Sequence, residues 1–85
     1  MKLNVYAIKD IKLGKFAQPI IANNDEIMKR MLTAAVNSEE ITALREFPED
    51  FDLYKIGEYS EETGKITSKV EFITNAAMTK KSNKE

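Results

Sequence analysis

Two tyrosines and a set of lysines are the side chains of this sequence best suited to bind a ligand. The rings of Tyr6 and Tyr54 could stack nucleobases, each stacked base contributing about 1–3 kcal/mol. Ammonium groups could follow the phosphate backbone of the same strand. The lysines in question lie around the first turn and in two later strands: Lys9, Lys12, Lys15, Lys55 and Lys69. Together these residues predict a sequence-independent interface for single-stranded DNA.

The same residue types also have a purely structural interpretation. Tyrosines and isoleucines on a sheet face can pack against a second subunit or a second helix. Lysines near a turn protect exposed strand edges from aggregation. Both interpretations hold together in a homodimer that leaves the lysine-rich hairpins outside, and we expect a homodimer because a chain this short buries a small core.

The composition argues against catalysis. The chain has no cysteine and no histidine, which removes thiolate nucleophiles, the usual zinc ligands and the side chain that titrates near neutral pH. The carboxylates of Glu49, Asp50 and Asp52 lack the spacing of an EF-hand loop. The segment Pro48-Glu49-Asp50 has the composition of an ordinary turn before a strand. We therefore expect a protein that is not an enzyme, with no cofactor and no metal site.

Charge is segregated along the chain although the net charge is only −1. Residues 1–37 carry six basic and three acidic side chains, residues 38–62 carry two and nine, and residues 63–85 carry five and two. Folding has to bring the two basic segments together to create a positive surface. The acidic segment is either a solvated face or a site for a basic partner.

No apolar run approaches the roughly 20 residues that span a bilayer, so we expect no membrane partner.

The elements that must position these residues follow from periodicity. Alternation over 2–9 predicts a strand, and 15–22 predicts an edge strand because Pro19 cannot donate to a ladder. Asn23 with Glu26 predicts the start of a helix over 24–36, and a short second helical segment runs from Ser38 to about Glu46.

The second half of the chain predicts a hairpin. One strand covers 51–59, with Gly57 weakening it or marking a bulge, and 61–64 form the loop. The next strand places Ile66, Val70 and Phe72 on one side, as in a half-buried antiparallel strand.

These elements predict an α+β fold: a four-stranded, mostly antiparallel sheet of ββ-α-ββ pattern in the order 2-1-3-4. One main helix covers one face, with a short second helix beside it. Residues 1–75 form a single domain and 76–85 a mobile basic tail. The uncovered sheet face carries some combination of these residues: Tyr6, Ile8, Tyr54, Ile56 and Lys69.

Several segments resemble the small nonstructural protein of gokushoviruses, tailless phages with single-stranded DNA genomes. The opening Met-Lys-Leu-Asn-Val-Tyr-Ala-Ile-Lys-Asp (1–10), Phe-Ala-Gln-Pro (16–19) and Thr-Ala-Ala-Val-Asn (33–37) contribute to this resemblance. Its most specific part is Pro-Glu-Asp-Phe-Asp-Leu-Tyr-Lys-Ile-Gly (48–57), followed by Glu-Thr-Gly (62–64). The resemblance covers roughly residues 1–66.

The resemblance implies a protein that is not a virion component and that acts in the cytoplasm of the infected bacterium. It also implies DNA binding near the switch to single-stranded genome synthesis or packaging. It supplies no catalytic or contact residues, so the candidate site rests on the residues above. The alternative function is a protein-interaction module for a viral replication or assembly protein, or for a host factor.

Overall fold

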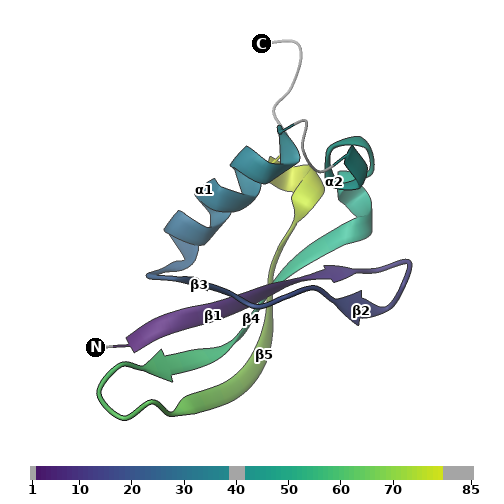
Figure 1. Ribbon diagram of the computed structural model, residues 1–85. Coiled ribbons are helices and arrows are strands. Elements are labelled where there is room, and N and C mark those ends of the chain that lie inside the picture. Colours follow the sequence, from purple (N-terminus) through teal and green to yellow (C-terminus); the bar gives the residue numbers. More distant parts are fainter. Residues whose placement is uncertain (1, 39–41, 80–85) are drawn as a thin grey trace.

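The computed structural model describes residues 2–38 and 42–79, which form an antiparallel sheet with helices on one side (Figure 1). The strands are β1 (Lys2–Asp10), β2 (Lys15–Phe16), β3 (Ile20–Ala22), β4 (Phe51–Ser60) and β5 (Ile66–Asn75). The helices are α1 (Asp25–Val36), α2 (Thr42–Glu46) and two 3-10 turns, η1 (Pro48–Asp50) and η2 (Ala76–Thr79). No helix in this part of the chain has the length and apolar character needed to cross a membrane.

The sheet has the order β2-β1-β4-β5, with β3 also paired to β1. This confirms the predicted α+β fold. The predicted second strand is divided into β2 and β3, because the segment between them contains Pro19, which has no backbone N–H to donate. The two short strands form one edge of the sheet, and the much longer β5 forms the other.

Helix α1 begins one residue later than the capping signal indicated. The side chain of Asn24, not that of Asn23, accepts a hydrogen bond from the N–H of Ile27 at 2.9 Å. Asn24 has the extended backbone typical of a cap. Asp25 and Glu26 lie in the first turn, where carboxylates interact favourably with the positive end of the helix.

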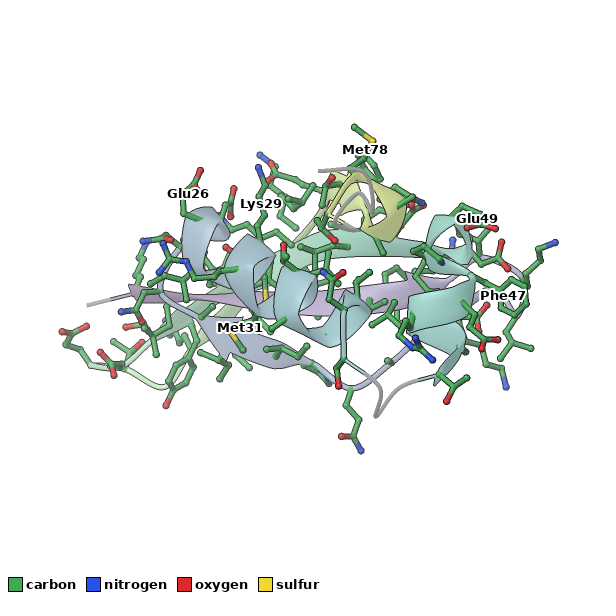
Figure 2. The ribbon with its side chains drawn as sticks, turned by 90° about the horizontal axis from the view of Figure 1, so that it is seen from above. Glu26, Lys29, Met31, Phe47, Glu49 and Met78 are labelled. Carbon is green, nitrogen blue, oxygen red and sulfur yellow. The ribbon has the colours of Figure 1, made fainter. Side chains whose placement is uncertain are left out.

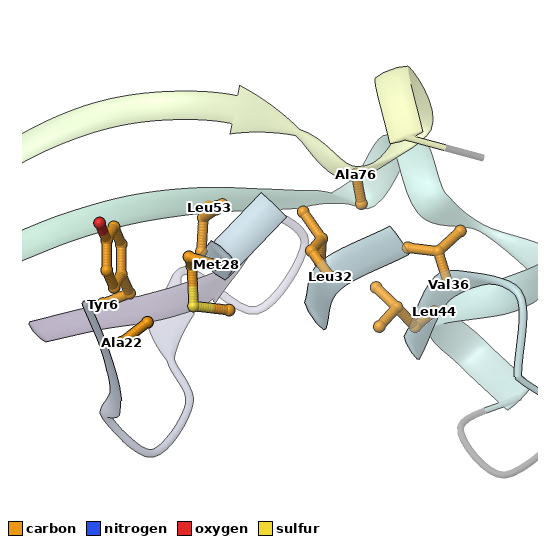
Figure 3. Packing of buried hydrophobic residues seen from close by; sticks show 8 residues of the cluster. All are labelled: Tyr6, Ala22, Met28, Leu32, Val36, Leu44, Leu53 and Ala76. Atoms are coloured by element: carbon orange, nitrogen blue, oxygen red, sulfur yellow. The ribbon is translucent and has the colours of Figure 1, made fainter. Parts of the chain in front are cut away.

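The core lies between α1 and one face of the sheet (Figure 3). Met28, Leu32 and Val36 repeat at intervals of four residues, so they form one buried stripe along α1. The other fully enclosed members come from the strands, α2 and η2: Tyr6, Ala22, Leu44, Leu53 and Ala76. Both helices and η2 therefore lie on the same side of the sheet.

The domain extends further than residue 75, where a mobile tail was expected to begin. Ala76 is completely buried in the core, and residues 76–79 form η2. The sequence does not indicate this extension clearly, because two alanines and one methionine give only a weak apolar signal before a polar segment. The remainder of the expected tail, residues 80–85, lies outside the described residues.

Gly57 lies at a bulge in β4, which is one of the two alternatives that the sequence left open. Val5 is opposite Gly57 while Tyr6 is opposite Lys55, so Ile56 is an extra residue in β4. A Cβ on Gly57 would lie 2.4 Å from the backbone oxygen of Thr67 in β5. The close approach of β4 and β5 at the bulge therefore requires glycine.

We expect Gly57→Ala to lower the free energy of unfolding by about 1–3 kcal/mol, because β5 has to move away from the added methyl group. Urea denaturation followed by circular dichroism measures this change. Ser68→Ala in the neighbouring strand, where the side chain is exposed, is the control and should change stability by less than about 0.5 kcal/mol. Equal midpoints for Gly57→Ala and the wild type would contradict the close approach.

Candidate functional site

The sheet face turned away from the helices is the candidate site. Successive side chains of a strand point to opposite faces, so the neighbours of the core residues on β1, β4 and β5 face the other way. We call this surface the open face, and it is formed by Val5, Ala7, Phe16, Ala17, Pro19, Ile21, Tyr54, Ile56, Tyr59, Ile66, Ser68, Val70 and Phe72. In the described part of the chain no helix covers it (Figure 1).

A groove of about 680 Å³ runs across the open face. Val5 and Ala7 of β1 form its floor and are almost fully buried. The walls are exposed apolar side chains, among them Ile21 at 52% and Val70 at 59% exposure. Among the described residues, those that line the groove include no charged side chain, and Tyr59 and Ser68 supply its polar groups. The groove is therefore suited to an apolar ligand surface.

An aromatic cluster lies beside the groove. The Tyr54 ring packs edge-on against Phe16, with centroids 5.3 Å apart, and against Phe72, at 5.8 Å. Such pairs contribute about 0.5–1.5 kcal/mol beyond the area they bury. The ammonium group of Lys9 lies 5.6 Å from the Phe16 centroid, a cation–π contact. This cluster is the place where the fold brings predicted site residues together, namely Tyr54 and Lys9.

Tyr6 does not belong to this surface, and the prediction that its ring is uncovered is wrong. Its exposure is 0%, because α1 packs over the face of β1 that carries it. Its hydroxyl donates a hydrogen bond to the carboxylate of Asp25 and accepts one from the Asn4 side chain at 3.0 Å. Burial and the hydrogen bond to Asp25 raise the pKa of Tyr6 to about 12. A ring enclosed in this way cannot stack on a base without opening of the core.

Lys55 and Lys69 also lie away from the open face, contrary to the expectation for Lys69. Lys55 is opposite Tyr6 in the register, and Lys69 lies beside Glu71 on the same side of the sheet. Their ammonium groups pair with carboxylates: Lys55 with Glu58 at 3.5 Å and Lys69 with Glu71 at 3.2 Å. The alternation of side chains along β4 and β5 thus separates these two lysines from Tyr54.

Lys12 and Lys15 are exposed at the hairpin between β1 and β2. Lys15 is the cross-strand neighbour of Asp10, and Lys9 that of Phe16. The first basic segment therefore forms a local group at one end of the sheet, next to the aromatic cluster. The predicted gathering of all five lysines on one surface does not occur.

Tyr54 and Ile56 lie on the open face as predicted, but the sequence did not predict the other apolar residues of this face as part of a binding surface. The alternation of Ile66, Val70 and Phe72 was visible, but an apolar stripe on a strand is usually read as its core side. Phe16 and Ile21 lie in short strands with no periodicity of their own. Knowledge of which sheet face the helix covers was needed to find them.

The chain matches a family of known proteins. The family described as Phage ORF5 protein matches residues 3–79, a range that includes all residues of the open face. No match was found among curated proteins or among solved structures.

The buried hydroxyl of Tyr6 generates a pH-dependent prediction. Tyr6→Phe should lower the free energy of unfolding by about 1.5–3 kcal/mol near neutral pH, because Asp25 loses a donor. Folding raises the pKa of Tyr6 above its usual value of about 10, so the stabilisation is complete below about pH 10 and disappears as the pH rises through about 12. Urea denaturation of both proteins between pH 7 and 12 should show the difference shrinking over that window.

Tyr59→Phe is the matched control for this measurement, because Tyr59 is half-buried on the open face. It should cost less than about 0.5 kcal/mol. A difference between Tyr6→Phe and the wild type that stays constant up to pH 12 would contradict the raised pKa.

Proposed function

The chain belongs to the Phage ORF5 protein family, and we propose that it is a phage accessory protein that acts by docking another protein on its open face. The observation that carries this proposal is the apolar groove, whose lining residues include no charged side chain in the described part of the chain. The proposed occupant is an apolar surface of a partner protein, because such a surface gains most from contact with this lining.

The energetics favour an apolar partner over a polyanion. Fully burying an exposed Ile, Val or Phe side chain contributes about 1.5–3 kcal/mol, and several such side chains are about half exposed here, including Phe16, Ile21 and Val70. A phosphate backbone would instead need ammonium groups along its path. In this fold Lys55 and Lys69 lie on the opposite side of the sheet with carboxylate partners.

The cellular setting of the proposal comes from the resemblance to the nonstructural protein of gokushoviruses. We propose that the protein acts without catalysis in the cytoplasm of the infected bacterium, outside the virion. Its docking partner is then a replication or assembly protein of the same phage, or a host factor that serves these steps.

A lysine in the wall of the groove should abolish this docking. We expect Ile21→Lys to weaken binding of the phage or host partner at least tenfold, because a charge would be buried against an apolar surface. The partner is to be identified by pairwise interaction screening of the phage's own proteins and then host replication factors. Isothermal titration calorimetry with the purified pair measures affinity, and a negative heat capacity change reports apolar burial.

Met78→Lys is the matched control, since Met78 is 79% exposed and lies on the helix side of the molecule (Figure 2). It should leave the affinity within about twofold, as expected for a surface change away from an interface. Equal losses for Ile21→Lys and Met78→Lys, or no loss for Ile21→Lys, would contradict docking on the open face.

Single-stranded DNA binding is the second candidate function, and the aromatic cluster is the observation in its favour. Tyr54 and Phe16 lie beside Lys9, with Lys12 and Lys15 in the adjoining hairpin. Rings next to ammonium groups can stack bases while the lysines contact phosphates. This is a smaller interface than the one expected from sequence, since Tyr6, Lys55 and Lys69 are excluded from it.

If this candidate is correct, Lys12→Glu/Lys15→Glu should weaken binding to all single-stranded sequences alike by at least tenfold. The logarithm of the binding constant should fall with that of salt concentration at a slope of about −0.7 per neutralised phosphate. Fluorescence anisotropy with labelled oligonucleotides at several salt concentrations measures both. Lys29→Glu/Arg30→Glu, the same charge change on α1, is the control. Binding that is absent at low salt, or insensitive to salt, would exclude this candidate.

A further inference from the structure

The outer edge of β5 is a long strand edge with its backbone groups available. Among the described residues β5 is paired with β4 alone, and it has ten residues with neither proline nor glycine. Residues 66–72 are exposed. The opposite edge of the sheet consists of two short strands separated by Pro19. A long, regular, exposed edge is a template for pairing with another strand.

We propose that two copies of the chain pair through β5, antiparallel and about a two-fold axis at Val70, to form one continuous sheet. When the two-fold axis is perpendicular to the sheet, the open faces of both copies lie on the same side of the joined sheet. The two open faces would then join into one apolar surface, and both α1 helices would lie on the other side.

Charge complementarity specifies this register. With the axis at Val70, Lys69 of each copy lies opposite Glu71 of the other, and opposite charges directly across a ladder are stabilising. Both side chains are already on the same side of the sheet, where they contact each other at 3.2 Å within one chain. Lys69 is 77% exposed at its side chain, so it is free to reach a second strand.

Neighbouring registers are unfavourable. Moving the axis by one residue places Lys69 opposite Lys69 of the second copy, or Glu71 opposite Glu71, and like charges directly opposite each other are destabilising. On the open face, the axis at Val70 brings the two Val70 side chains together and places Phe72 opposite Ser68. Val70 and Phe72 are both more than half exposed in the single chain, and this contact would cover part of each.

This pairing can be tested apart from the docking proposed above, although Val70 also lines the groove. It uses the edge of β5, whereas Ile21 lies in β3 at the other edge of the sheet. Self-association can therefore fail while docking on the open face succeeds, and the reverse also holds.

Charge reversal tests the register. In sedimentation velocity experiments the wild type should show a monomer–dimer equilibrium, and Lys69→Glu or Glu71→Lys alone should raise its dissociation constant about tenfold or more, because two symmetry-related pairs become repulsive. The double variant Lys69→Glu/Glu71→Lys should recover dimerisation. A 1:1 mixture of the two single variants should also recover it, since one chain then carries two carboxylates and the other two ammonium groups at this edge.

Recovery in the mixture separates the proposed pairing from a simple loss of the intrachain Lys69–Glu71 contact, which mixing cannot restore. Circular dichroism verifies that each variant is folded. A wild type that stays monomeric up to millimolar concentration would overturn the proposal. A dimer that is indifferent to both single reversals would overturn it as well.

Cysteine substitution gives a direct measure of register, because the chain contains no cysteine. Val70→Cys should form a covalent dimer under mild oxidation, since residues opposite each other in a ladder are within disulfide distance. Ser68→Cys, exposed on the same face, is the matched control. Its two copies would be separated by four residues along the strand, about 13 Å, and should not cross-link. Equal cross-linking of the two variants would contradict an axis at Val70.

Discussion

The sheet is apolar on both faces but has only one layer of helices to cover it in the described part of the chain, and this constraint governs the rest of the structure. The twelve residues of α1 present one buried stripe, Met28, Leu32 and Val36, which packs on the side of β1 that carries Tyr6. The hydrogen bond from Tyr6 to Asp25 ties the first turn of the helix to that strand. Once α1 occupies this side, α2 and η2 complete the same layer, and the other face of the sheet remains without a cover in the described part of the chain.

This choice of side also determines where charge and aromatic rings are found. Side chains alternate along β4, so Leu53 and Lys55 lie toward the helix layer while Tyr54 lies on the open face. Lys55 in the same strand and Lys69 in the neighbouring β5 are thereby separated from Tyr54, and they lie beside Glu58 and Glu71. The open face is apolar in its centre, and Lys9 and the lysines of the β1–β2 hairpin lie beside its aromatic cluster. Its chemistry is therefore closer to that of a protein interface than to that of a nucleic-acid groove.

The chain belongs to the Phage ORF5 protein family, and the most prominent feature of its described surface is the uncovered apolar face of the sheet. The apolar sheet face and the long edge of β5 are two distinct surfaces, one for each of the two proposed modes of association. At the bulge, the missing side chain of Gly57 lets β5 approach β4 closely, and bulges of this kind bend the strand that contains them.

The sequence alone determined the main elements and their order and the edge position of the segment that contains Pro19, and it offered a bulge at Gly57 as one of two alternatives. These follow from local properties: side-chain periodicity, capping groups, and the missing N–H of proline. It could not determine which face of the sheet is covered, because β1 is apolar on both sides, with Val5 and Ala7 on one and Tyr6 and Ile8 on the other. Alternation with a period of two shows which residues share a face of the strand, but it does not show which face is buried. Only the packing of α1, a contact between residues far apart in the chain, buried Tyr6 and left Phe16, Tyr54 and Phe72 at the surface.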